Sequence, residues 1–349
     1  MNSELNFRSI ELFAGAGGLA LGLEQAGFSH IGLIEKDKDC VATLRLNRPN
    51  WNVICEDISL FTDRDLEKEF TIRKGELDLL SGGPPCQSFS TAGKKLGLDD
   101  TRGTMFYYYA FFLEALQPKV FLFENVKGLQ THDHGRTYSI ISNVFREMGY
   151  TIVARVLNAW DYGVSQKRER FFTVGIRNDL KNRMNFVFPE PHPYKPLLKD
   201  IKLDIAPSED ECFYYSSRKK EIMDMVPPGG CWQNIPLEIA KEYMGASWFL
   251  EPIGKGKTGI LRRFSLDEPC YTVMTTPTGN YTERCHPLET RPFSFRENAR
   301  IQSFPDEWEF CGSLASKYKQ VGNAVPVKLA KAIGLQIMKA ISELEKGSI

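Results

Sequence analysis

The 349-residue chain is poor in the residues that build metal sites and disulfide frameworks. It contains five histidines and eight cysteines, and no two cysteines form a Cys-x-x-Cys pair. We therefore expect neither a zinc cluster nor a disulfide scaffold, and free thiols fit a reducing compartment. The formal net charge is zero, so overall charge alone does not indicate a nucleic-acid partner.

Long apolar runs are also missing. No run approaches the roughly 20 residues of a membrane-spanning helix, and the first nine residues lack the apolar centre of a signal peptide. Hydrophobic residues make up 42% and charged residues 25% of the chain, as in ordinary globular proteins. We expect a soluble, cytoplasmic protein that makes no membrane contact and is long enough for two domains.

What is present begins with a glycine-rich turn near the start of the chain. Residues 8–13 are predicted to form a strand, residues 14–18 (Ala-Gly-Ala-Gly-Gly) a tight turn, and residues 19–26 a helix. Strand, glycine turn and helix together open many doubly wound sheets that bind nucleotide cofactors. The alternative is that these glycines serve only close packing of the helix on the strand.

Two acidic residues follow the next two predicted strands. Residues 30–34 lead into Glu35, and residues 52–55 are followed by Asp57. A carboxylate at the first position can accept hydrogen bonds from ribose hydroxyls, and Asp57 could accept one from an adenine amino group. Either acid alone could be a solvated loop charge, but together with the glycine turn they favour a nucleotide-type cofactor site.

A cysteine follows the fourth predicted strand, residues 77–80. Two glycines and two prolines lead from this strand into Cys86, and the prolines restrict the backbone that aims the cysteine. Open α/β sheets bind their ligands at this edge. A thiolate there would be a strong nucleophile if a neighbour lowered its pKa from about 8.5. The alternative is a buried, inert cysteine.

A carboxylate and a cluster of hydrogen-bond donors follow further along. Residues 119–123 are predicted to form a buried strand that ends at Glu124, where it can converge with Cys86. Residues 161–170, which include Gln166, Arg168 and Arg170, have no apolar periodicity. They suit contacts to an anion or a base edge, or else form a solvated charged turn. Residues 151–157 and 170–176 are predicted to be a closing pair of strands.

The second half has a different composition. Four prolines between residues 189 and 196 mark a linker, and residues 197–290 contain few clean helix or strand patterns. A loop-rich domain of this kind suits a surface that reads a nucleic-acid groove, or an oligomerisation module. Regular patterns return in residues 295–304 and 327–343. The sequence thus predicts an α/β fold with a doubly wound, mostly parallel sheet and a second, smaller domain.

Six blocks in this order resemble the cytosine-C5 DNA methyltransferase family. They cover nearly the whole chain except residues 190–290. The blocks are Glu11 to Gly18, Pro85-Cys86-Gln87, Glu124-Asn125-Val126, Gln166-x-Arg168-x-Arg170, Arg291 to Arg300 and Gly322 to Pro326. The resemblance implies a Rossmann-like methyltransferase fold with a catalytic domain over residues 1–188, a small recognition domain over 189–315, and a C-terminal segment, 316–349, that returns to the catalytic domain.

By this resemblance the cofactor is S-adenosyl-L-methionine. The residues implied to bind it are Phe13, Gly15, Gly17, Gly18, Glu35, Asp57, Ile58, Pro85, Asn323 and Val325. The implied catalytic residues are Cys86, Glu124, Arg168, Arg170 and Gln166, with Cys86 adding to C6 of the target cytosine. Glu11 stands where many family members have Asp, which could change how the methionine end of the cofactor is held.

The implied partner is double-stranded DNA, from which the target base is flipped out at a cost of a few kcal/mol. Candidate DNA contacts are Ser88, Lys94, Lys95 and Arg102, in a predicted loop over the substrate, and Thr272 and Thr275 in the small domain. A chain this compact looks like the modification enzyme of a bacterial restriction-modification system, acting as a monomer on DNA with no obligate protein partner.

Three alternatives remain. A transfer-RNA cytosine methyltransferase would share the blocks, although its members usually have a short insertion where this chain has about 100 residues between Arg170 and Arg291. A non-catalytic DNA-binding relative would not need Cys86, Glu124 and Arg168 together. A dinucleotide-dependent oxidoreductase would explain the glycine turn and Glu35 but none of the other blocks.

Overall fold

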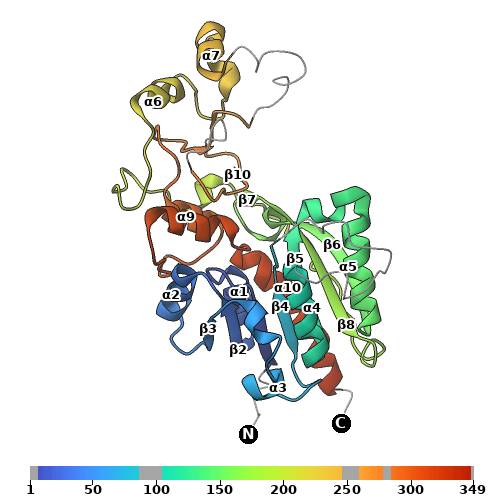
Figure 1. Ribbon diagram of the computed structural model, residues 1–349. Coiled ribbons are helices and arrows are strands. Elements are labelled where there is room, and N and C mark those ends of the chain that lie inside the picture. The colour runs from blue at the N-terminus through green and yellow to red at the C-terminus, as the bar shows by residue number, and fades with distance from the viewer. Residues whose placement is uncertain (1–6, 86–103, 246–258, 278–283, 347–349) are drawn as a thin grey trace. The chain divides into compact units, whose positions relative to one another are not determined.

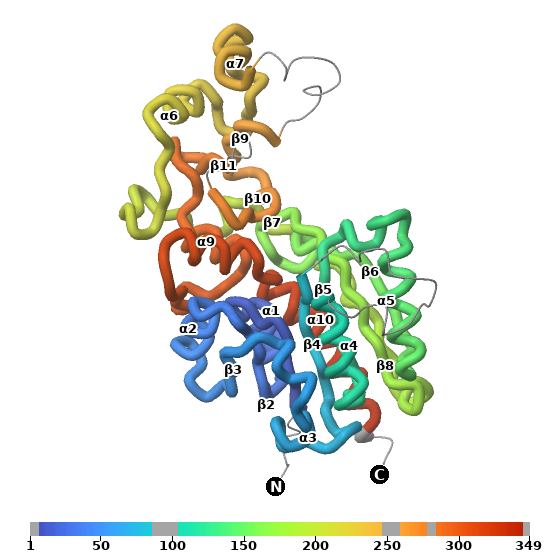
Figure 2. Tube along the Cα trace, in the orientation of Figure 1, coloured from blue at the N-terminus to red at the C-terminus, as the bar shows by residue number. Residues whose placement is uncertain are grey.

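The computed structural model describes residues 7–85, 104–245, 259–277 and 284–346 (Figures 1 and 2). The chain forms two compact units. Unit 1 comprises Met1–Gly163, Arg168–Tyr194 and Ala324–Ile349, and unit 2 comprises Val164–Lys167 and Lys195–Asn323. Among the described residues, no helix has the length and apolar character needed to cross a bilayer.

Unit 1 is built on a seven-stranded sheet with the order β3-β2-β1-β4-β5-β8-β6. The strands are β1 (Phe7–Leu12), β2 (Phe28–Glu35), β3 (Val53–Cys55), β4 (Leu79–Gly82), β5 (Val120–Val126), β6 (Tyr150–Asn158) and β8 (Glu169–Arg177). Neighbours run parallel except at β8, which is antiparallel to both β5 and β6. The winding reverses between β1 and β4, the point where such sheets bind ligands. The predicted doubly wound, mostly parallel fold is confirmed.

Helices cover both faces of this sheet (Figure 1). They are α1 (Gly18–Ala26), α2 (Lys38–Asn47), α3 (Leu66–Glu69), α4 (Met105–Leu116), α5 (Arg136–Glu147) and α10 (Val327–Lys346), with short 3-10 turns η1 (Ile58–Phe61), η3 (Lys127–Gln130), η4 (His132–Gly135) and η5 (Ala159–Tyr162). Aromatic side chains of α4, α5 and β5 form the centre of one core, where the Phe121 and Phe145 rings lie 4.4 Å apart. This packing fixes β5, the strand that carries Glu124.

The helices α1 and α10 approach each other unusually closely. A Cβ added at Gly22 of α1 would lie 2.4 Å from the Cβ of Ala330 and 2.6 Å from the Val327 carbonyl oxygen. One added at Gly334 of α10 would lie 2.8 Å from the Cβ of Ala26. Glycine is therefore required at both positions by close helix packing, and α10 belongs to the same compact unit as the glycine turn.

Unit 2 has little regular structure. Its elements are β7 (Gln166–Lys167), η6 (Leu198–Asp200), α6 (Ser217–Asp224), η7 (Trp232–Asn234), α7 (Leu237–Met244), β9 (Arg262–Arg263), β10 (Cys270–Tyr271), β11 (Arg284–Cys285), α8 (Phe295–Ile301) and α9 (Leu314–Asn323). The buried Arg291 guanidinium donates to both oxygens of the buried Glu297 carboxylate, at 2.7 and 3.1 Å. Ser294 caps α8 in a reciprocal capping box with the same Glu297, so one carboxylate fixes the start of this helix.

The observed elements differ from the sequence predictions in two informative ways. Glu124 was expected after its strand, but β5 continues through Val126 because Glu124, Asn125 and Val126 pair with the first residues of β8. The helices α6 and α7 were not predicted. Their patterns are short, and the exposed surface of α6 carries charges of both signs, from Arg218, Lys220, Glu221 and Asp224.

Candidate active site

The glycine turn after β1 has a backbone that most residues avoid. Phe13, Gly15 and Gly17 have φ angles of 58°, 54° and 87°, and Gly17 is the N-cap of α1. A non-glycine residue with positive φ, such as Phe13, is a strained conformation that often marks a functional site. A Cβ added at Gly15 would meet no atom within 4 Å, so the turn borders open space, while Gly18 is buried as the first residue of α1.

Glu35, the last residue of β2, ties this turn to the next loop. One carboxylate oxygen accepts from the Gly15 amide at 2.8 Å, and the other accepts from the Lys36 and Asp37 amides at 2.8 Å each. The carboxylate is thus held rigidly beside the turn. The oxygen that faces Gly15 retains a lone pair for one further donor.

Asp57 occupies the corresponding position after β3. Its carboxylate accepts from the Ser59 amide at 3.0 Å and from the Lys36 ammonium at 3.3 Å. These interactions lower its pKa, the hydrogen bond from the Ser59 amide most of all. Ile58 is buried at the start of η1. A charged residue and an apolar residue thus follow each other after β3, and Asp57 contacts Lys36, the residue after β2.

Glu11 is buried within β1, with 1% of its surface exposed. Burial raises its pKa to about 8, although hydrogen bonds from Ser81 and from the Ala20 amide oppose the shift. The Ser81 hydroxyl lies 3.4 Å from the carboxyl group. A pKa of about 8 favours the protonated form of Glu11 at neutral pH.

The turn that leads to Cys86 is shaped by contacts with neighbouring strands. Neither Gly82 nor Gly83 has positive φ. Instead a Cβ at Gly82 would lie 2.6 Å from the Leu12 carbonyl oxygen, and one at Gly83 would lie 2.5 Å from a Glu124 carboxylate oxygen. The glycines are required by close approach. The buried Asn125 side chain then donates to the Pro84 carbonyl at 3.0 Å, which positions the residues just before Cys86.

Glu124 forms the charged centre of this edge. Its carboxylate lies 3.1 Å from Nε of Arg170, and 13% of its side chain is exposed. Burial raises the pKa of Glu124, while the cations Arg170 and Arg168 partly oppose the rise. Arg168 is 1% exposed, and burial lowers its pKa, as does the neighbouring Arg170 charge.

Arg168 and Arg170 reach this edge because β8 runs antiparallel to β5. The register places Arg170 opposite Val126 and Phe172 opposite Glu124. Asn158 at the end of β6 accepts from the Arg168 amide at 3.2 Å, and the Arg168 carbonyl accepts from the Ala159 amide at 2.9 Å. The roles of Asn125 and Asn158 were not predicted, because their hydrogen bonds depend on partners distant in sequence.

Four predicted residues lie in unit 2. Gln166 is completely buried and both ends of its amide are hydrogen-bonded, to Gln302 and to the Val273 amide. The Thr272 hydroxyl donates to the Lys167 carbonyl at 3.1 Å, and Thr275 is exposed. Asn323, also exposed, is the last residue of α9.

The remaining predicted residues are placed as follows. Pro85 is exposed, and Val325 is buried in unit 1. Cys86, Ser88, Lys94, Lys95 and Arg102 lie outside the described residues.

These features define the class of protein. The ends of β1, β2 and β3 present a strained aromatic residue beside open space and two carboxylates, which suits a nucleoside-containing cofactor. Two strands further along the same edge, a buried acid is paired with guanidinium groups. The molecule is an α/β enzyme of the Rossmann-like class.

Comparisons with known proteins identify the family. The family model for C-5 cytosine-specific DNA methylase matches residues 7–339. The Type II methyltransferase M.Sau96I of Staphylococcus aureus is 52% identical over 97% of this chain and 77% of its own length. M.PspPI of Psychrobacter sp. (strain TA137) is 51% identical over 98% of this chain and 81% of its own length.

Solved structures agree on the fold. A candidate DNA modification methyltransferase encoded within an Escherichia coli prophage has a TM-score of 0.70 at 24% identity, over 97% of this chain and 100% of that chain. The S. pombe Dnmt2 methyltransferase has a TM-score of 0.64 at 17% identity, over 99% of this chain and 100% of that one. The chain belongs to the C-5 cytosine-specific DNA methylase family and is a DNA cytosine-5 methyltransferase.

Proposed function

We propose that this chain transfers a methyl group from S-adenosyl-L-methionine to C5 of a flipped-out cytosine in a short, specific sequence of duplex DNA, as the modification enzyme of a restriction-modification system. The observation that carries the proposal is the partly buried Glu124–Arg170 pair, 3.1 Å apart, at the edge where Pro84 and Pro85 lead into Cys86. The Type II methyltransferase relatives, 52% and 51% identical over nearly the whole chain, support the restriction-modification assignment.

The residues after β1, β2 and β3 fit the cofactor. Phe13 would stack on the adenine, Glu35 would accept a ribose hydroxyl at its free lone pair, and Asp57 would accept from the adenine amino group. The open space beside Gly15 would admit the cofactor's methionine end. When bound, S-adenosyl-L-methionine supplies an electrophilic methyl group.

The protein has to make cytosine C5 nucleophilic. The Cys86 thiolate adds to C6, forming an S–C6 bond and moving the C5–C6 π electrons into the ring. Glu124, whose pKa burial raises, would donate a proton to N3, and Arg168 would balance charge that develops at O2. Arg170 holds the Glu124 carboxyl in place. C5 then has enamine character and takes the methyl group.

Release reverses the addition. Loss of the C5 proton to a base returns the electron pair of that bond to the ring, C5=C6 re-forms, and the C6–S bond breaks to regenerate the Cys86 thiolate. The N3 proton returns to the Glu124 carboxylate, so both groups are restored. Unit 2 and residues 88–103 would supply the phosphate and base contacts that offset the cost of flipping. Ser88, Lys94, Lys95, Arg102, Thr272 and Thr275 are the candidates. The enzyme would work in the cytoplasm, as a monomer on DNA.

The test is a transfer assay with S-adenosyl-L-methionine carrying a tritiated methyl group, offered with duplex DNA or with transfer RNA. We expect label in DNA, and bisulfite sequencing of DNA from expressing cells would identify the site. Cys86→Ser should abolish turnover but leave cofactor binding, measured by calorimetry, largely intact. Label found in RNA alone would overturn the substrate assignment, and substantial turnover by Cys86→Ser would remove Cys86 from its role.

A further inference from the structure

Two buried glutamines connect three separate parts of unit 2. The Val273 amide donates to Oε1 of Gln166 at 2.8 Å, and Nε2 of Gln166 donates to Oε1 of Gln302 at 2.7 Å. Nε2 of Gln302 then donates to the Val321 carbonyl at 2.8 Å. Both glutamine side chains are completely buried. We call this series of hydrogen bonds the glutamine relay.

The direction of the relay is fixed at both ends. The Val273 amide can only donate and the Val321 carbonyl can only accept, so each glutamine must use its oxygen on one side and its nitrogen on the other. Neither amide can turn over without placing two acceptors or two donors together in a buried site, which costs about 1–3 kcal/mol per unsatisfied group. The relay therefore specifies one arrangement of its three parts.

Further contacts converge on the same stretch, residues 272–276, which we call the threonine-rich segment. Just before it, β10 pairs with β7, with Cys270 opposite Gln166. A Cβ added at Gly322 of α9 would lie 2.6 Å from both the Met274 carbonyl oxygen and the Thr275 amide nitrogen. The backbone of the segment is thus seated between β7 and the last turn of α9.

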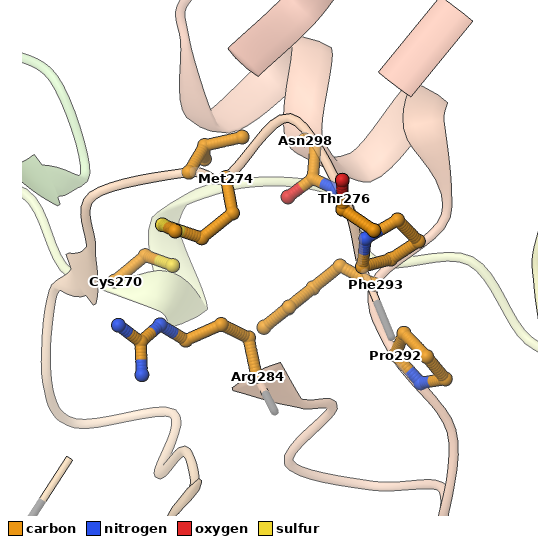
Figure 3. Close-up of a pocket in the computed structure, with 9 residues that line it drawn as sticks. Cys270, Met274, Thr276, Arg284, Pro292, Phe293 and Asn298 are labelled. Carbon is orange, nitrogen blue, oxygen red and sulfur yellow. The ribbon is translucent and has the colours of Figure 1, made fainter. Parts of the chain in front are cut away.

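Side chains of the threonine-rich segment form the wall of a pocket within unit 2. Met274 and Thr276 line it together with Phe293 and with Asn298 of α8 (Figure 3). Val273, whose amide ends the relay, also lines it. A change in the register of the segment would therefore change the shape of this pocket and the direction of the exposed Thr275 and Thr276 side chains.

We propose that Gln302, acting through Gln166, is a positioning residue for sequence discrimination: the relay sets the register of the threonine-rich segment against β7 and α9. The proposal rests on the proposed function, in which unit 2 reads DNA. Gln302 is placed as a positioning residue and not a catalytic one, because its hydrogen bonds with Gln166 and with the Val321 carbonyl lie inside unit 2. Its loss should reduce discrimination between the target site and related sites more than it reduces cofactor binding.

The experiment compares Gln302→Met, which keeps the side-chain length but breaks the relay, with the wild-type enzyme. Methylation rates are measured on duplexes with the wild-type site, found by bisulfite sequencing, and on duplexes that differ from it by one base pair. We expect the ratio of the target rate to the best single-mismatch rate to fall about tenfold in Gln302→Met.

Gln320→Met is the matched control. Gln320 is also a buried glutamine, and it donates to the Cys311 carbonyl at 2.8 Å and to the Ser316 hydroxyl at 3.2 Å. It should lose stability to a similar degree and keep the wild-type ratio. An unchanged ratio in Gln302→Met, or an equal fall in both variants, would overturn the proposal. If Gln302→Met does not fold, Gln302→Asn, which withdraws the amide by one carbon, is subjected to the same comparison.

A second measurement needs no activity. Hydrogen exchange of the Val273 amide should be at least about fivefold faster in Gln302→Met than in Gln320→Met, because its acceptor is no longer held in place. Equal exchange in the two variants would overturn the proposal. A wild-type enzyme that methylates no DNA would instead overturn the proposed function, and the exchange result would still test the relay.

Discussion

At the scale of single residues, the protonation of Glu124 decides how the site works. Burial raises its pKa, and the Arg170 and Arg168 cations pull the pKa back down. A carboxyl group that donates to the target ring must keep its proton near neutral pH. The rate of methylation should therefore fall as pH rises through the pKa of Glu124.

Arg170→Ala should move this fall to higher pH. Removing the cation 3.1 Å from Glu124 destabilises the carboxylate, so the pKa of Glu124 rises. Single-turnover methylation rates between pH 6 and 10, with cofactor and DNA saturating, would show the shift together with a lower maximal rate. Lys127→Ala is the control, because Lys127 pairs with the exposed Glu169. If the methylation rate of Arg170→Ala falls at the same pH as that of the wild-type enzyme, or at a lower pH, the role given to Arg170 is contradicted.

The sequence predicted the position of Glu124 but not the arrangement of the residues around it. A carboxylate after a buried strand predicts convergence with Cys86 because parallel strands end at one edge. Arg170 lies at this edge because it is near the start of β8, which runs antiparallel to β5. The direction of a strand cannot be deduced from its own residues. The close approach of the Glu124 carboxylate to Gly83 could not be predicted, because the two residues lie some forty positions apart.

At the scale of elements, the crossing of α1 and α10 holds the glycine turn in place. Gly22→Val should weaken it, because a side chain at 22 would overlap Ala330 and the Val327 carbonyl. Overpacking of this kind costs about 1–3 kcal/mol. Urea unfolding would measure the loss.

The control for this crossing is Leu335→Ala. Leu335 lies on α10, as Ala330 does, but its side chain is 47% exposed. The substitution should change the free energy of unfolding by no more than about 0.5 kcal/mol. An unchanged urea midpoint for Gly22→Val would show that the helices separate at no cost. Each helix was predictable from its apolar pattern. Their contact was not, because about 300 residues separate Gly22 from Ala330 and neither pattern specifies its partner.

At the scale of the whole molecule, the proposed reaction predicts a trapped complex. A duplex with 5-fluorocytosine at the target position should remain covalently attached to the enzyme in the presence of S-adenosyl-L-methionine, because fluorine at C5 cannot leave as a proton does. Denaturing electrophoresis would show a band of combined mass. The Cys86→Ser variant should give none, and a band of equal intensity from that variant would place the bond on another residue.

The sequence predicted the doubly wound fold and a loop-rich second region because apolar strands, glycine turns and strand-end acids recur in order through the first half. The use of Val164–Lys167 by unit 2 was not predictable. These four residues look like the charged turn before β8, and only their pairing with β10 and the burial of Gln166 show where they belong.

The three-part composition of unit 1 has a consequence during protein synthesis. Its first helix ends at Ala26, whereas α10, which covers Gly22, begins at Val327. At about 5–20 residues per second, a ribosome needs roughly 15 to 60 seconds to make the intervening chain. For that time the nascent protein leaves the apolar side of α1 without its final covering. Chains that terminate early keep this surface open to chaperones and proteases, so the cell can remove incomplete copies before they accumulate.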